Sequence, residues 1–162
     1  MMLATGVSLD ARIAIEDLYA TYVALLDARD YEPWMDLFIE ECAYQVKSSE
    51  NDERGFPLAA LAFESKGMLR DRIYGITNTL FHEPYYQRHL VTNFRIRADE
   101  HEGYRVEANY LVCRTKTGEL TEVYSTGTFR DRVVEIDGEY LFAEKRAIYD
   151  SELIPNSLIY PI

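Results

Sequence analysis

Residues 88–99, RHLVTNFRIRAD, open the part of the sequence that decides the fold. Residues alternate in polarity along this segment, as they do in a strand with one buried face. The two expected faces carry Leu90, Thr92, Phe94 and Ile96 on one side and His89, Asn93, Arg95 and Arg97 on the other. The pattern predicts a strand, and it puts His89 on the same polar face as the arginines that follow it.

Three more strand-like segments follow, and they span about 103–116, 119–134 and 139–150. The pairs Thr117-Gly118 and Asp137-Gly138 predict tight turns between them, since glycine takes a positive φ without penalty. Gly127 lies inside the third segment, where a glycine indicates a bulge or a bend. The C-terminal half therefore predicts a long, bent antiparallel meander.

The N-terminal half is mainly helical. Residues 9–30 predict one long helix, capped by Ser8 and with Asp10 in the first turn where the helix dipole favours it. Its apolar face is formed by Ile15, Leu18, Tyr19, Tyr22, Leu25 and Leu26. A short helix is expected after Pro33 and another near Ser65. Between them we expect a first strand over 42–48 and a polar loop over 48–57.

Helices followed by a bent meander give an α+β fold, in which a strongly curved antiparallel sheet wraps the N-terminal helices as a cone. This architecture resembles the nuclear-transport-factor-2-like and cystatin-like folds, and the resemblance is one of fold alone. The 162 residues have the length of a single domain, so residues 1–162 are treated as one unit. The cone interior is either filled by side chains or hollow.

Composition limits the function classes. The net charge of −11 opposes both nonspecific nucleic-acid binding and docking on anionic lipid. No apolar run approaches the roughly 20 residues of a membrane helix, and MMLATGVSLD has neither region of a signal peptide. We expect a cytoplasmic protein in which Cys42 and Cys113 stay reduced.

The cysteines, histidines and glycines of the sequence lack the spacings that known metal and cofactor sites require. Neither cysteine has a histidine or another cysteine nearby, as a Rieske cluster requires. His82 and His89 are separated by Pro84, and His101 lies in a polar turn, so neither a facial iron triad nor a zinc site is indicated. Nucleotide-binding glycine motifs are missing from the sequence. We therefore expect neither metal nor cofactor in this chain.

Acid–base chemistry inside the cone is the alternative interpretation. Asp27 near the end of the long helix, Tyr22 before it and His89 on a core strand could converge as base, polarising group and acid. A stand-alone dehydratase or isomerase would use all three. A module that binds a hydrophobic ligand would need only the cavity.

Several short motifs in fixed order resemble the small (beta) subunits of aromatic-ring-hydroxylating dioxygenases, which are Rieske non-haem iron oxygenases. They are Glu53-Arg54-Gly55, Glu64-Ser65, Met68-Leu69, Asp71-Arg72, Tyr86, Arg88-His89-Leu90-Val91, Asn93 and the ending Leu158 to Ile162. The similarity covers about Ile13 to Ile162. Its segments ERGFPLA and ESKGMLRDR are most similar to those of the small subunits of salicylate-, anthranilate- and benzoate-type oxygenases.

The resemblance implies a cone-like structural subunit without catalytic residues of its own. The Rieske [2Fe–2S] cluster and a mononuclear iron are expected in a large (alpha) subunit, with electrons supplied from NAD(P)H by a separate reductase. Three large and three small subunits would form the assembly, and the isolated small subunit is expected to form a trimer.

Under this interpretation the basic residues Arg88 and His89, at the start of the 88–99 strand, face a partner. Tyrosines near loops and strand ends, and the apolar ending SLIYPI, are suited to interfaces or to docking on the chain's own sheet. The expected interface residues are Arg88, His89, Arg95, Arg97 and Tyr160.

Overall fold

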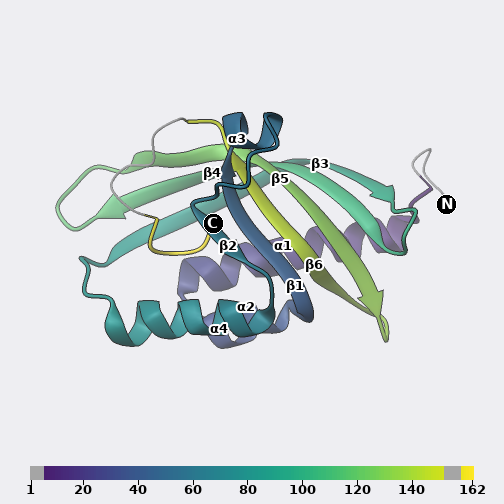
Figure 1. The fold of residues 1–162 in the computed structure, drawn as a ribbon, viewed down its shortest axis with the longest axis horizontal. Helices are drawn as coiled ribbons and strands as arrows, with labels where there is room; N and C mark the ends of the chain where they lie inside the picture. The colour runs from purple at the N-terminus through teal and green to yellow at the C-terminus, as the bar shows by residue number, and fades with distance from the viewer. Residues whose placement is uncertain (1–5, 152–157) are drawn as a thin grey trace.

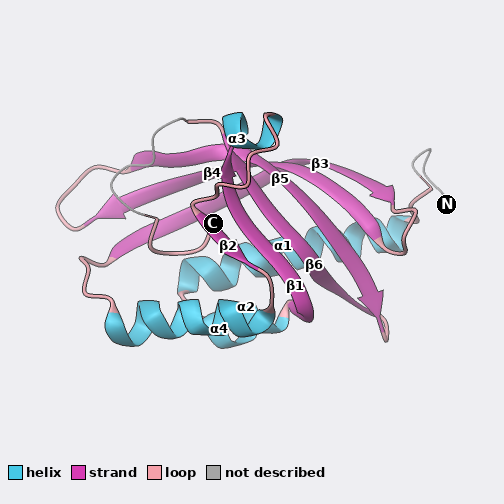
Figure 2. Cartoon of the chain, in the orientation of Figure 1, coloured by secondary structure: helices cyan, strands magenta, loops and turns pink. Residues whose placement is uncertain are grey.

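The computed structural model describes residues 6–151 and 158–162. The helices are α1 (Leu9–Ala28), α2 (Tyr31–Asp36), α3 (Ser49–Glu53) and α4 (Lys66–Tyr74), and α4 continues into the π-helical turn η1 (Gly75–Thr79). The strands are β1 (Phe38–Ser48), β2 (Leu61–Phe63), β3 (Tyr85–Ala98), β4 (Tyr104–Lys116), β5 (Glu122–Ile136) and β6 (Glu139–Tyr149). Figure 2 shows how these elements are distributed.

One curved sheet holds all the strands, in the order β2-β1-β6-β5-β4-β3. Its pairs are antiparallel except for β1 and β6, which run parallel. Helices α1, α2 and α4 cover the concave side, and α3 lies on the other side (Figure 1). The predicted α+β cone is confirmed. Among the described residues no helix is long and apolar enough to cross a membrane.

The long helix begins and ends for local reasons. The Ser8 hydroxyl accepts a hydrogen bond from the Ala11 amide at 3.1 Å, as an N-cap should. At the other end Arg29 has a φ of 58°, a left-handed conformation that stops the helix just before the predicted residue 30. The predicted helix is thus confirmed to within two residues.

The meander matches its prediction closely, and its turns use the expected glycines. Gly118 has a φ of 78° and Gly138 a φ of 84°. Gly127 lies where β5 approaches β6 so closely that a Cβ atom would be 2.0 Å from the carbonyl oxygen of Ile148. Here glycine permits close contact between two backbones, which lets the sheet curve tightly.

The segment between the first two helices and α4 differs from the prediction. Strand β1 begins at Phe38 instead of residue 42, because its register with β6 shifts between Phe38 and Ala43 and the polarity no longer alternates there. The predicted polar loop contains α3, whose N-cap Ser48 accepts a hydrogen bond from Asn51. That loop prediction was wrong over Ser49–Glu53, because a short exposed helix has no apolar stripe to reveal it.

Aromatic rings fill the space between α1 and the sheet. The rings of Tyr22 and Phe142 have centroids 5.4 Å apart, and those of Trp34 and Phe38 are 5.0 Å apart, mostly edge to face. The largest aromatic side chains that are fully buried are Tyr19, Tyr22, Trp34, Phe38, Tyr44, Phe129 and Phe142. This part of the cone interior is therefore packed with side chains.

Candidate functional site

Strand β3 changes its inward-facing residues halfway along. Asn93 has a φ of 60°, and the register with β4 shifts between Thr92 and Arg95. Before this bulge the odd-numbered residues Gln87 and His89 are buried, and after it Ile96 is buried instead. The prediction that His89 shares a face with Arg95 and Arg97 was wrong, because one extra residue in a strand reverses the alternation beyond it.

His89 points inward and is held by Asp27 of α1. Its Nδ1 atom lies 2.7 Å from Asp27 Oδ1, and its imidazole is completely buried. The backbone N–H of His89 also donates to Asp27, at 3.2 Å, and Arg88 approaches the same carboxylate at 3.2 Å. Because β3 is an edge strand, Asp27 satisfies an amide that no neighbouring strand can reach.

Tyr22 does not join this pair. Its hydroxyl donates to the main-chain oxygen of Ile162 at 2.5 Å, and the Tyr44 hydroxyl donates to the same oxygen at 2.9 Å. Tyr44 also accepts the amide of Ile162 at 2.9 Å. The structure thus brings together Asp27 and His89 of the alternative acid–base set, whereas Tyr22 binds the C-terminal segment.

The described end of the chain, Leu158 to Ile162, packs against the chain's own cone. Arg72 of α4 donates to the carbonyl oxygens of Leu158 and Ile159 at 2.9 and 2.8 Å. The ring of Tyr160 lies 4.7 Å from that of Tyr85, and only 5% of Tyr160 is exposed. Tyr160 and His89 are therefore both buried within their own subunit, and the partner contact expected of them stays a prediction.

A buried ionic group that the sequence did not reveal lies deeper in the cone. Lys145 donates to Asp131 Oδ2 at 2.8 Å, and the Tyr19 hydroxyl donates to the same oxygen. Burial lowers the pKa of Lys145 to about 8 and raises the pKa of Asp131, while each charge opposes the other's shift. Both side chains are fully enclosed, with the Lys145 ammonium 3.0 Å from the centroid of the Phe129 ring. We interpret this group as structural.

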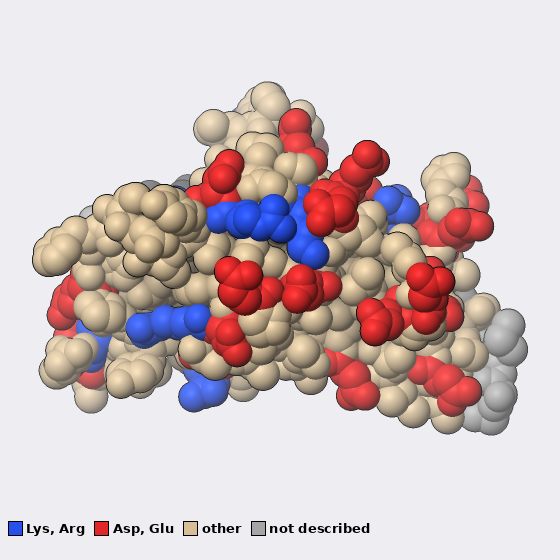
Figure 3. Space-filling model, turned by 90° about the horizontal axis from the view of Figure 1, so that it is seen from below, with Lys and Arg blue, Asp and Glu red and all other residues tan. Residues whose placement is uncertain are grey.

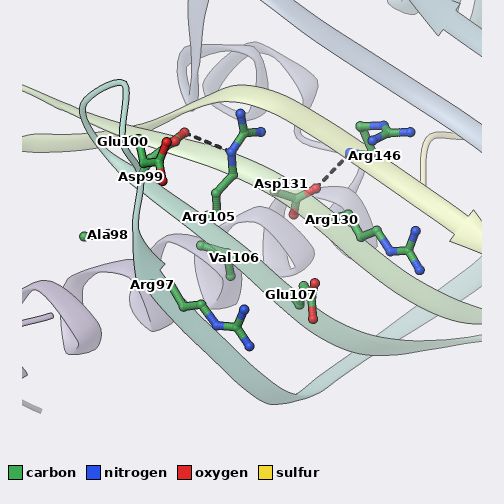
Figure 4. Close-up of a pocket in the computed structure, with 10 residues that line it drawn as sticks. All are labelled: Arg97, Ala98, Asp99, Glu100, Arg105, Val106, Glu107, Arg130, Asp131 and Arg146. Carbon is green, nitrogen blue, oxygen red and sulfur yellow. Dashed lines mark hydrogen bonds and ion pairs between the residues drawn. The ribbon is translucent and has the colours of Figure 1, made fainter. Parts of the chain in front are cut away.

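The outer side of the sheet carries arginines in rows across the strands. Arg97 of β3 is opposite Arg105 of β4, and Arg105 is opposite Arg132 of β5. In the adjacent row Arg95 is opposite Glu107, and Glu107 is opposite Arg130. These rows border a hollow of about 400 Å³ that is lined by arginines and carboxylates together (Figure 4). Its charged lining residues are Arg97, Arg105, Arg130, Arg146, Asp99, Glu100, Glu107 and Asp131.

Carboxylates neutralise part of this arginine surface. Asp52 of α3 binds Arg130 at 2.7 Å and Arg146 at 2.6 Å. Arg105 binds Asp99 at 2.9 Å. Glu144 accepts from Arg105 at 3.1 Å and lies 3.6 Å from Arg132. Of the expected interface residues, Arg88, Arg95 and Arg97 are exposed.

The helical side of the molecule has the opposite charge. Seen from below, this face shows many more acidic than basic side chains (Figure 3). Exposed carboxylates are concentrated in α2 and the residues flanking it, and we call this group the acidic band: Asp30, Glu32, Asp36, Glu40 and Glu41. Among the described residues only one of these carboxylates has a cation partner, the pair Asp36–Lys66 at 3.4 Å.

The metal donors of the chain do not fit an iron–sulfur cluster or a mononuclear iron. Cys42 is on β1 and Cys113 on β4, with two strands between them, and His89 Nδ1 is bound to Asp27. Within residues 6–151 and 158–162, no group of three or more histidine, cysteine or acidic side chains is placed to hold a metal ion. No chemical step can be derived from such a centre here.

Comparison with known proteins identifies the family. The family model described as "Ring hydroxylating beta subunit" matches residues 22–156. The chain belongs to this family. As a ring-hydroxylating beta subunit it is the small subunit type of the aromatic-ring-hydroxylating dioxygenases, whose oxygenase also contains a large subunit.

Individual relatives agree with this family. The chain is 30% identical over 141 residues to the anthranilate 1,2-dioxygenase small subunit of Burkholderia cepacia, covering 87% of this chain and 88% of that one. It is 27% identical over 151 residues to a beta subunit of the terminal oxygenase component of terephthalate 1,2-dioxygenase from Comamonas sp, covering 93% and 97%.

Solved structures with a similar fold include a beta subunit and a protein with a cystatin-like fold. A crystal structure assigned to the beta subunit of an aromatic-ring-hydroxylating dioxygenase of Novosphingobium aromaticivorans DSM 12444 has a TM-score of 0.85 and 34% identity, covering 94% of this chain and 97% of that one. A Nostoc punctiforme PCC 73102 protein with a cystatin-like fold has a TM-score of 0.63 at 18% identity, covering 94% and 96%, and this likeness concerns the fold alone.

Proposed function

We propose that this chain is a non-catalytic structural subunit of a Rieske-type oxygenase that hydroxylates an aromatic acid or hydrocarbon. The large subunit would carry the [2Fe–2S] cluster and the mononuclear iron. Three large and three small subunits would form the assembly. The expected compartment is the cytoplasm, where thiols such as the unpaired Cys42 and Cys113 stay reduced.

The observation that carries the proposal is how Tyr22 is used. In the acid–base alternative this hydroxyl would polarise a substrate beside Asp27 and His89. It binds Ile162 instead, together with Tyr44, and aromatic rings pack the surrounding cone. A hydroxyl already bound to the chain's own backbone supports a role in holding the subunit together.

The names of the two relatives described above refer to anthranilate and terephthalate, which are aromatic acids. We therefore favour aromatic acids as the substrate class of the whole oxygenase. Because aromatic rings pack the cone interior between α1 and the sheet, we assign substrate selection to the large subunit.

The test is co-expression of this chain with the large-subunit gene adjacent to its own, followed by purification through a tag on this chain. We expect a stable complex of both chains, with all iron and acid-labile sulfide in fractions that contain the large subunit. Native mass spectrometry measures the stoichiometry. Purification of this chain alone as a well-folded protein with dehydratase or isomerase activity would contradict the proposal and restore Asp27 and His89 as candidate catalytic residues.

A further inference from the structure

Two neighbouring polar side chains on the inner face of β3 are buried with an atom left unpaired. They belong to Gln87 and His89, which are 6% and 5% exposed. Among the described residues, neither Gln87 Nε2 nor His89 Nε2 has a hydrogen-bond partner. A polar atom that leaves water without gaining a new partner destabilises the folded state, so such atoms are rare in protein interiors. Two of them on one strand indicate a bound molecule that satisfies both.

The spacing of the two residues allows one molecule to reach both. Gln87 and His89 both precede the bulge at Asn93, and residues two apart in a strand point to the same face. Their Cα atoms are then about 6–7 Å apart. A single oxygen atom can therefore lie within hydrogen-bond distance, about 2.7–3.2 Å, of both side chains.

Asp27 determines what His89 can bind. The Asp27 carboxylate, which also pairs with Arg88, accepts hydrogen bonds, so the hydrogen between it and His89 lies on Nδ1. In the neutral imidazole Nε2 is then an acceptor, whereas Gln87 Nε2 is a donor. The missing partner must donate one hydrogen bond and accept another. A hydroxyl group does both.

Polar side chains on the neighbouring strand β4 are already engaged. Arg114, directly opposite Gln87, donates to Glu122 from Nε and Nη2 at 2.8 and 2.6 Å. The Tyr110 hydroxyl lies 3.2 Å from that of Ser125. Within the described part of the chain, these neighbours leave the two nitrogen atoms of Gln87 and His89 unpaired.

We propose that Gln87 and His89 bind the hydroxyl group of a small molecule that is not part of this chain. Gln87 Nε2 donates to the hydroxyl oxygen, and His89 Nε2 accepts its hydrogen. An enclosed water and a small phenol both carry this group. A phenol would find aromatic surroundings, because the Arg114 guanidinium lies 5.4 Å from the ring centroid of Tyr85 and 4.4 Å from that of Tyr124. This site is additional to the proposed structural role and does not depend on it.

The test combines a high-resolution crystal structure of the full chain with a titration by phenol. The crystal structure should show an oxygen atom within about 2.7–3.2 Å of both nitrogen atoms. The titration follows the NMR signals of the His89 ring, and toluene, which lacks the hydroxyl group, is the matched ligand. A saturable change with phenol and none with toluene identifies a phenol site. An enclosed oxygen without any response to phenol identifies water as the bound molecule.

Gln87→Met removes the donor and keeps the length of the side chain. It should eliminate the enclosed oxygen, or weaken phenol binding at least about tenfold. Gln45→Met, on β1 and separated from β3 by three strands, is the matched control and should change neither. Circular dichroism shows whether each variant is folded. If Gln87→Met is not, Gln87→Asn takes its place, because it withdraws the amide without removing it, and the expected loss is smaller.

The inference is wrong if the crystal structure shows no oxygen at this position and phenol leaves the His89 signals unchanged. It is also wrong if phenol and toluene bind equally well, because the hydroxyl group is then not recognised. Unaltered occupancy in a folded Gln87→Met variant would equally overturn it.

Discussion

Asp27 has several tasks at one point of the structure. Its carboxylate binds the His89 imidazole, the His89 amide and the Arg88 guanidinium, and its side chain is only 8% exposed. This single residue therefore fixes the end of α1 against the edge strand. Such an arrangement resembles a catalytic dyad in geometry, yet every contact that it makes also stabilises the fold.

The first prediction concerns Asp27→Asn. The amide is neutral and offers one acceptor oxygen where the carboxylate offers two, so His89 and Arg88 both lose a charged partner. We expect the free energy of unfolding to fall by about 1.5–3 kcal/mol, measured by urea denaturation. Asp17→Asn, at an exposed position of the same helix, is the matched control and should change it by less than about 0.5 kcal/mol. Equal effects of the two substitutions would show that Asp27 is not a fixed contact.

The second prediction concerns the buried ion pair. Lys145→Met leaves Asp131 charged and enclosed, and removing one partner of a buried pair costs about 3–5 kcal/mol. Adding Asp131→Asn should recover part of this loss, because the uncompensated charge disappears while an acceptor remains for the Arg146 amide. Chemical denaturation of both single variants and the double variant measures the coupling. Strictly additive losses would mean that the two groups do not interact.

The third prediction is loss of stability at alkaline pH. Burial raises the pKa of Tyr44 from 10.0 to about 12. The unfolded chain ionises this phenol first, so its contribution is complete below pH 10 and is lost as the pH rises from 10 to 12. The loss amounts to about 3 kcal/mol for this residue. Unfolding free energies measured across this range should fall less steeply in Tyr44→Phe, and an unchanged slope would refute the assignment.

At the scale of the element, β3 depends on one residue with an unusual backbone. Asn93 accepts its φ of 60° more readily than other residues that carry a Cβ atom. Asn93→Val should therefore destabilise the protein by about 1–2 kcal/mol, since a β-branched side chain is strained in this conformation. Asn93→Gly is the matched variant and should be close to neutral. Thermal unfolding compares the two, and a valine variant as stable as the glycine variant would argue against the bulge.

Sequence patterns predicted most of the helices and strands, because in most of them apolar residues recur with one constant period. The meander was predicted to within about three residues at each end, and the glycines at 118 and 138 take positive φ as expected. Strand β2, with three residues, is too short to show a period. The parallel pairing of β1 with β6 joins segments about 100 residues apart, which no local pattern can reveal.

The candidate site was predicted less well, and the reason is the bulge. A strand pattern with a period of two assumes that no residue is inserted along the strand. The bulge at Asn93 breaks this assumption, and the sequence pattern therefore placed His89 on the wrong face. The asparagine itself was a usable signal, because asparagine is enriched at positive φ. The Asp27–His89 contact was considered in the acid–base alternative, whereas the binding of Tyr22 to Ile162 depends on the path of a distant segment.

For the whole molecule, the helical surface carries a surplus of carboxylates (Figure 3). The hollow on the outer side of the sheet is instead lined by arginines and carboxylates together. The packed interior between α1 and the sheet is consistent with the structural role proposed for this subunit.

The last prediction concerns the trimer that is expected of the isolated chain. If self-association depends on exposed arginines and carboxylates, it should weaken as salt rises, because the Debye length falls from about 10 Å at 0.1 M to about 3 Å at 1 M. Sedimentation of the isolated chain across this range should show the oligomer giving way to the monomer of 18.8 kDa. Association that strengthens with salt would indicate that apolar side chains, such as the exposed Phe81 and Leu120, dominate the contact instead.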